Sequence, residues 1–219
     1  MLLAGALTVA GVAGATPAQA ATCTITNFSP RSVVVGLTPV TATFDVATSG
    51  CTRDSWTVEE SEWDFYVYDG APQETFNPYS NSEAGAKDVI VTADSSDWTT
   101  SERVFADGFS LRRRTTWQGN TFNASPEPVR KGAPVSIVGR LVVADWNKDQ
   151  YVPYASRQVA VQFRTPTGTY TTVKTVQTNS DGWVRTTVPA SVTGIWRLSY
   201  GGNTVAGPAV ATGDSVQVN

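Results

Sequence analysis

Apolar and polar side chains alternate along much of the second half of the chain. In residues 135–143 the apolar side chains of Val135, Ile137, Leu141 and Val143 fall on one face of an extended segment. Alternation, or a short run rich in β-forming residues, returns in residues 157–165, 170–178, 183–189, 196–200 and 214–218. A period of two is typical of a β-strand with one buried face. The second half therefore reads as a series of short strands.

Turn signals separate these stretches. Asn179-Ser180-Asp181-Gly182 is a strong hairpin signal, and Gly201-Gly202-Asn203 turns the chain before its last strand. About seven short strands with regular turns are typical of an immunoglobulin-like (Ig-like) Greek-key sandwich. An up-and-down barrel is the alternative.

The first half is less regular. Alternation in residues 40–46 and 62–68 predicts two strands, with Trp63, Phe65 and Val67 on the inward face of the second. Residues 87–92 and 103–113 supply further strands. Residues 71–87 are rich in Pro, Asn, Ser and Gly, so we expect a long loop there.

Both halves begin with a similar motif. Ser29-Pro30-x-x-Val33-x-x-Gly36-x-x-Pro39-Val40 recurs as Ser125-Pro126-x-x-Val129-x-x-Gly132-x-Pro134-Val135. The motif predicts a strand that Pro keeps at a sheet edge, a Gly turn, and a second strand entering the core. We expect an all-β chain of two tandem sandwiches, residues 21–118 and 119–219.

Residues 1–20 resemble an export signal. They contain no charge, are built mainly from Ala, Gly, Leu and Val, and end in Ala18-Gln19-Ala20, a small-x-small cleavage pattern. The positively charged segment that usually precedes the apolar run is missing. The alternative is a lipoprotein acylated at Cys23. No later stretch is long and apolar enough to span a membrane, so we expect a secreted, extracellular protein.

The composition narrows the possible functions. The 219-residue chain has a net charge of −3, which gives no electrostatic support for nucleic-acid binding. It has no histidine, which excludes Ser-His-Asp and Cys-His catalysis and histidine zinc sites. We therefore expect a protein that is not an enzyme. An enzyme using carboxylates alone is a weaker alternative.

The two cysteines, Cys23 and Cys51, both lie in the first half. In an exported protein we expect them to form one disulfide, which would stabilise the fold by about 3 kcal/mol through the unfolded state. A pair of free thiols is the other possibility.

The second half resembles a known kind of domain. The residues that carry the resemblance are Asn123-Ala124-Ser125-Pro126-Glu127-Pro128-Val129, Gly139-Arg140-Leu141, Ala144-Asp145-Trp146, Val161-Gln162-Phe163-Arg164 and Trp196-Arg197. Together they are similar to a domain of secreted actinobacterial proteins, some of which are labelled calcium-binding. The resemblance covers most of residues 120–218 and is loose for residues 21–118. It implies an Ig-like fold and export, and no particular activity.

One short motif has the oxygen spacing of a calcium loop. Asp145, Asn147 and Asp149 place carboxylate, amide and carboxylate at alternate positions. A calcium ion needs six to eight oxygen ligands, so these three are only part of a site. The other interpretation is a polar turn between two strands. Calcium is the one cofactor that the sequence suggests.

Seven tryptophans are many for this length. Trp63 and Trp196 are expected in the core. Trp117, Trp146 and Trp183 fall near turns or the junction of the halves. If exposed, they are candidates for stacking on a sugar ring; the alternative is that they fill the seam between the domains.

These patterns favour a secreted, non-enzymatic Ig-like protein that binds or scaffolds at the cell exterior. Its partner would be an extracellular protein or glycan, and we expect no nucleic-acid partner and no membrane span. The alternatives are a calcium- or carbohydrate-binding module and a secreted protease inhibitor that presents residues 71–87.

Overall fold

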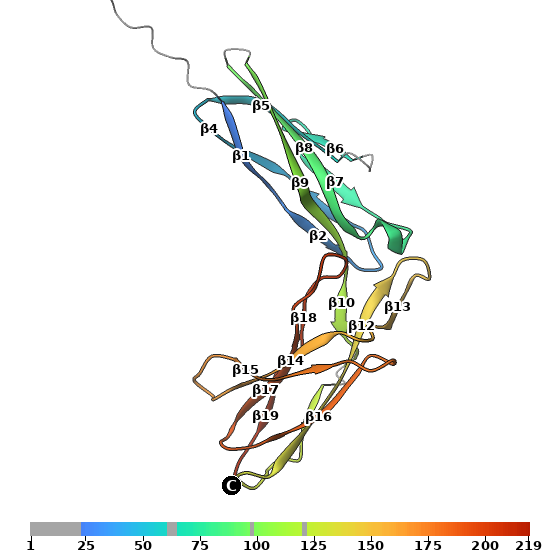
Figure 1. Cartoon of the computed structure of the whole chain (residues 1–219), viewed down its shortest axis with the longest axis vertical. Coiled ribbons are helices and arrows are strands. Elements are labelled where there is room, and N and C mark those ends of the chain that lie inside the picture. The colour runs from blue at the N-terminus through green and yellow to red at the C-terminus, as the bar shows by residue number, and fades with distance from the viewer. Residues whose placement is uncertain (1–22, 61–64, 97–98, 120–121) are drawn as a thin grey trace, which may run out of the picture.

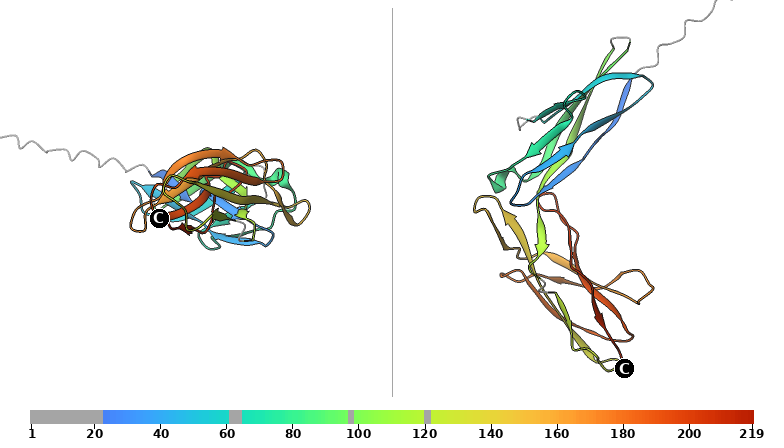
Figure 2. Two further views of the ribbon diagram at one scale, coloured as in Figure 1. Left: turned by 90° about the horizontal axis from the view of Figure 1, so that it is seen from below. Right: turned by 180° about the vertical axis from the view of Figure 1, so that it is seen from behind.

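The computed structural model of the chain is all-β apart from one 3₁₀ turn. It describes residues 23–60, 65–96, 99–119 and 122–219. Two β-sandwiches follow one another along the long axis of the molecule (Figure 1), and the view from behind shows the same end-to-end arrangement (Figure 2). A search of the described part for an apolar helix of membrane-spanning length finds none.

The first sandwich has one large sheet and two strand pairs. The large sheet has the order β2-β9-β8-β5-β6, and the pairs β1-β4 and β3-β7 form the other layer. The strands of this half are β1 (Thr24–Ser29), β2 (Ser32–Val35), β3 (Val40–Thr43), β4 (Asp45–Ser49), β5 (Arg53–Glu60), β6 (Tyr66–Tyr68), β7 (Gln73–Phe76), β8 (Gly85–Ser95) and β9 (Thr100–Arg113).

Phenylalanine rings fill the space between these two layers. Phe44, Phe65, Phe76 and Phe109 pack with ring centroids 5.4–6.4 Å apart. Phe65 and Val67 are buried while Tyr66 and Tyr68 between and beyond them are exposed, as the alternation predicts. Trp63 and residues 62–64 of the predicted strand lie outside the described residues.

The second sandwich has the two layers expected of an Ig-like unit. One sheet has the order β15-β14-β17-β18, with β19 also on β17; in the other, the long strand β12 pairs with β10, β11, β13 and β16. The two sheets form an open sandwich with edges, so the barrel alternative is wrong. The strands are β10 (Thr115–Trp117), β11 (Asn123–Ser125), β12 (Pro134–Asp145), β13 (Gln150–Pro153), β14 (Gln158–Arg164), β15 (Thr171–Gln177), β16 (Trp183–Pro189), β17 (Gly194–Tyr200), β18 (Ala209–Val210) and β19 (Asp214–Val216).

The repeated Ser-Pro motif marks the same event in both halves. Ser29 ends β1, which runs antiparallel to β4, and β2 then pairs in parallel with β9 of the other layer. Ser125 likewise ends β11, which pairs with β12, and Val129 then makes a parallel bridge to Val218. Proline lacks the N–H that a continued ladder would need. The motif is therefore the point at which the first strand crosses from one sheet to the other.

The prediction of a long loop at residues 71–87 is wrong. The segment contains β7, the 3₁₀ turn η1 (Asn81–Glu83) and the start of β8. Strand β7 was missed because it has four residues, Gln-Glu-Thr-Phe, of which only Phe76 is buried. The predicted export signal, residues 1–20, lies outside the described residues.

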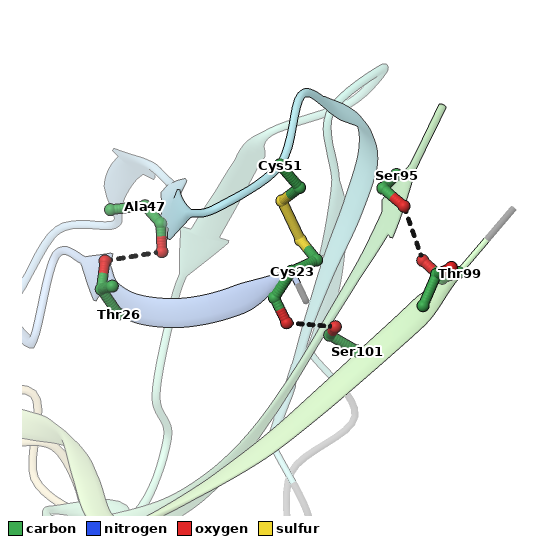
Figure 3. The surroundings of a disulfide bond; sticks show 7 residues. All are labelled: Cys23, Thr26, Ala47, Cys51, Ser95, Thr99 and Ser101. Carbon is green, nitrogen blue, oxygen red and sulfur yellow. Dashed lines mark hydrogen bonds between the residues drawn. A yellow bond between two sulfur atoms is a disulfide. The ribbon is translucent and has the colours of Figure 1, made fainter. Parts of the chain in front are cut away.

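The predicted disulfide between Cys23 and Cys51 is confirmed. It links the residue before β1 to the residues after β4, so it closes one end of that strand pair (Figure 3). The carbonyl of Cys23 also accepts a hydrogen bond from the Ser101 hydroxyl at 2.7 Å, which ties this end to β9 in the other layer.

Removing the disulfide should destabilise the first sandwich selectively. The bridge spans a sequence separation of 28 residues. By loop-closure entropy, Cys23→Ser with Cys51→Ser should lower its free energy of unfolding by about 3–4 kcal/mol. Urea unfolding followed by hydrogen exchange in peptides of β5 and β14 measures this. An equal loss of protection in β14 would contradict a local effect.

Candidate functional site

The connection between the two sandwiches is a single residue, Arg114, between β9 and β10. Its backbone N–H donates to the carbonyl of Val35 in the first half at 2.7 Å. Its carbonyl accepts from the N–H of Ala144 in the second half at 2.8 Å. Because both backbone groups of the linker are bonded to opposite halves, the linker has little freedom to bend.

Trp146 is carried by the second sandwich but belongs to the core of the first. It follows the last residue of β12, is 7 % exposed, and packs in the same buried cluster as Phe44 and Val35. Its indole N–H donates to the carbonyl of Gly36 at 2.9 Å. The buried ring gains apolar contact while its one polar atom stays hydrogen-bonded, which is the arrangement that makes a buried tryptophan stabilising.

A capped turn of the first sandwich lies next to Trp146 and is hydrogen-bonded to its backbone. Ser80 and Glu83 form a capping box: the Glu83 carboxylate accepts from the N–H of Ser80 at 2.8 Å, and the Ser80 hydroxyl accepts from the N–H of Ser82. This reciprocal bonding fixes the turn that carries Asn81. The pattern Ser80-x-x-Glu83 is the sequence signal for this turn, which was expected to be part of a loop.

Asn81 bonds to three successive residues of the second sandwich. Its amide Nδ2–H donates to Asp145 Oδ1 at 2.8 Å, and its Oδ1 accepts the N–H of Trp146 at 2.9 Å. Its backbone N–H donates to Asn147 Oδ1 at 3.0 Å. Together with the Trp146 ring, these bonds form what we call the joint: Gly36, Asn81, Asp145, Trp146 and Asn147.

The joint explains the sequence Asp145-Trp146-Asn147 without a metal ion. Asp145 Oδ1 and Asn147 Oδ1 accept hydrogen bonds from Asn81, and Asp145 Oδ2 lies 3.6 Å from the Lys148 ammonium. Asp149 lines a cavity of about 320 Å³ beside the Trp146 ring. No group of three or more His, Cys, Asp or Glu suited to a metal occurs in the described ranges. Calcium at these residues stays a prediction from spacing.

The three candidate sugar-stacking tryptophans have different surroundings. Trp146 is buried in the joint, so its ring is closed to a sugar, and the seam-filling alternative describes it. Trp183 is half-buried, with the guanidinium of Arg185 4.9 Å and that of Arg140 5.9 Å from its ring centroid. Trp117 lines a cleft of about 500 Å³ with Asp214, and its indole N–H donates to the carbonyl of Ala209. Trp117 is thus a half-buried candidate that lines an open cleft.

A row of exposed and half-buried side chains, apolar except for Glu59, crosses the large sheet of the first sandwich. The strand registers place Tyr66 opposite Glu59, Glu59 opposite Ile90, and Ile90 opposite Val104. Tyr68 lies in the next row, with its ring 6.2 Å from that of Tyr66. The exposed fractions are 55 % for Tyr66, 44 % for Tyr68 and 57 % for Val104. We call Tyr66, Tyr68, Ile90 and Val104 the tyrosine face.

Three carboxylates lie within or next to this face. Glu59 and Glu102 are exposed within its two rows, and Asp94 lies one row further along the same side of the sheet. Hydrogen bonds from the hydroxyls of Thr100 and Ser55 hold the pKa of the Asp94 carboxyl below its usual value. Because Glu59 lies between Tyr66 and Ile90, the tyrosine face mixes exposed apolar side chains with negative charge.

Comparisons with known proteins identify no relative by sequence. No protein-family model matches the chain, and no curated protein does either. Among solved structures, fibronectin(III)-like modules of Clostridium thermocellum CbhA are 9% identical, cover 90% of this chain and 93% of theirs, and have a TM-score of 0.38.

Two further solved structures are similarly distant. The D00-D0 domain of Intimin is 12% identical over 87% of this chain and 98% of its own, with a TM-score of 0.32. A bacterial ice-binding adhesin is 12% identical over 92% of this chain and 66% of its own, with a TM-score of 0.31. These similarities are too weak to support a statement about the function of this chain.

Breaking the hydrogen bonds of the Asn81 side chain should lower the free energy of unfolding of the protein. Asn81→Ala removes two hydrogen bonds and leaves the carboxylate of Asp145, 6 % exposed, without that donor. We expect a loss of about 2–3 kcal/mol in the free energy of unfolding, measured by urea titration.

A matched control and a double variant make this test specific. Ser82→Ala changes a side chain on the same turn whose hydroxyl bonds to the Ser80 hydroxyl within that turn, and we expect a change under about 0.5 kcal/mol. Asn81→Ala combined with Asp145→Ala should be clearly non-additive, since the two side chains are in contact. Additive losses would show that Asn81 and Asp145 do not act together.

Proposed function

We propose that this chain is an exported, non-enzymatic binding module whose two sandwiches form a stiff rod. The tyrosine face of the first sandwich binds a protein partner at the cell exterior. The single observation that carries the proposal is the pair of neighbouring rings of Tyr66 and Tyr68, each more than two-fifths exposed, on a sheet face that also exposes Val104. Large exposed apolar groups gathered in one place are typical of interaction surfaces.

The chemistry of the face indicates the kind of partner. Tyrosine combines a large apolar ring with a polar hydroxyl, so it tolerates water in the free protein and gains from burial in a complex. The carboxylates of Glu59, Asp94 and Glu102 favour a partner whose contact surface carries basic residues among apolar ones. The joint supports this role because a stiff connection holds the face at a fixed distance from the second sandwich.

Two features support export. Residues 1–20 have the composition and the Ala18-Gln19-Ala20 ending of a cleaved signal, and Cys23 and Cys51 form a disulfide, which persists in oxidising compartments. The protease-inhibitor alternative loses support, because residues 71–87 form β7 and a capped turn that is bonded to the second sandwich. Calcium at Asp145, Asn147 and Asp149 and a glycan beside Trp117 remain alternatives.

A binding experiment with a matched variant tests the proposal. Secreted and surface proteins of the producing organism are fractionated by isoelectric point and immobilised beside a set of polysaccharides. We expect the purified chain to be retained by a basic protein fraction. Tyr66→Ala with Tyr68→Ala should weaken retention about tenfold or more, as loss of interface tyrosines typically does.

The control is Val192→Ser, which changes another exposed apolar residue, 47 % exposed, in the second sandwich. It should leave retention unchanged. Equal retention of the tyrosine variant, or retention by no protein fraction, would rule out the proposed face. Tyrosine-dependent retention by polysaccharides alone would replace the protein partner with a glycan.

A further inference from the structure

The second sandwich contains a cavity that the proposed function does not use. It lies where the edge strands β15 and β16 face each other and has a volume of about 360 Å³. Ligand pockets in proteins have volumes of roughly 300–1,000 Å³, so the space suits a small molecule. Its lining is mostly apolar: Phe163, Val173, Val188, Pro189 and Trp196, with Lys174, Thr187 and Ser191.

Two aromatic rings form one wall of the cavity. Phe163 and Trp196 are cross-strand partners on β14 and β17, with ring centroids 4.6 Å apart. Trp196 is 4 % exposed, and Val188 from the facing sheet is 5 % exposed. The Phe163 ring occupies the place where a side chain at residue 194 would lie, since a Cβ on Gly194 would come within 2.3 Å of it. The aromatic wall is therefore fixed by the backbone around it.

A lysine occupies an inward position beside this wall. Lys174 on β15 pairs with the buried Val161 on β14, so its side chain leaves the inner face of the sheet. A bulge follows directly, because Val161 pairs with Lys174 while Gln162 pairs with Thr172. The Lys174 ammonium donates to the Thr186 hydroxyl at 2.7 Å and to the carbonyl of Thr187 at 3.4 Å. The charge is thus held across the opening between the two sheets.

We propose that this cavity binds a single-chain amphiphile with an anionic headgroup, such as a medium-chain fatty acid. The alkyl chain would lie against Phe163, Trp196 and Val188, and the carboxylate would accept a hydrogen bond from the Lys174 ammonium. Among the lining residues Lys174 is the one that carries a charge, so an anionic head and an apolar tail match the cavity. The alternative is that Lys174 only protects this sheet edge from pairing with another strand, a role that needs no ligand.

Octanoate, octanol and octyltrimethylammonium are the probes that separate these alternatives. Isothermal titration calorimetry measures affinity, and the indole NMR signal of Trp196, assigned with Trp196→Phe, reports the site. We expect one octanoate to bind, octanol to bind about tenfold more weakly, and octyltrimethylammonium not to bind. A charge-assisted hydrogen bond contributes roughly what a tenfold change in affinity requires.

Three variants complete the experiment. Lys174→Gln should weaken octanoate about tenfold and leave octanol unchanged, and Ser191→Trp should abolish both by filling the opening. Lys148→Gln, an exposed lysine at the joint, should change neither. Circular dichroism checks that each variant is folded, and a misfolded Ser191→Trp is replaced by Thr187→Trp. No octanoate binding, or equal binding by wild type and Lys174→Gln, would overturn the proposal. Neither result would change the proposed role of the tyrosine face, which is tested separately.

Discussion

The burial of Trp146 in the core of the neighbouring sandwich is the interaction on which the two-domain structure depends. A tandem pair joined only by a linker would have two closed cores and a variable angle between them. Here the ring of one half completes the apolar core of the other, with its indole N–H satisfied by Gly36. The polar groups beside the ring are paired with Asn81, so the seam is both apolar and hydrogen-bonded. The linker residue Arg114 is bonded separately to both halves through its own backbone groups.

The predictions from sequence worked where one face of a strand is buried and the other is wet. In that situation alternation is a direct record of burial, as at Val135 to Leu141 in β12 and at Phe65 to Tyr68 in and beside β6. Short strands are different. β7, β10 and β13 have three or four residues each, and they are extended because they pair with a neighbour rather than because of their own pattern. A pattern in one segment cannot contain that information.

Prediction from sequence is limited in the same way at the joint. The motif Asp145-Trp146-Asn147 predicts either an oxygen-rich cation loop or a polar turn, because spacing alone reports which atoms are near one another along the chain. The actual partner, Asn81, lies 64 residues earlier than Asp145. A tryptophan inside a turn of Asp and Asn was the available clue, since a large apolar ring in such a turn needs a place to be buried. The seam-filling alternative used that clue.

The proposed function depends on a stiff connection between the two sandwiches. Exposed tyrosines next to carboxylates on one sheet face are the feature from which we propose a binding role. In the proposed function, the joint holds the tyrosine face at a fixed position relative to the second sandwich. The second sandwich has a separate cavity, which we propose binds a small amphiphile. The two proposed sites lie in different halves, so each can be lost without the other.

The relative orientation of the two sandwiches in solution tests the central claim most directly. Residual dipolar couplings are measured for backbone amides of both halves in a weakly aligned sample. If Trp146 and Asn81 fix the joint, the couplings of both halves fit one alignment tensor with the orientation of the structure, and Trp146→Ala gives two different tensors. Two different tensors in the wild-type protein would contradict the account.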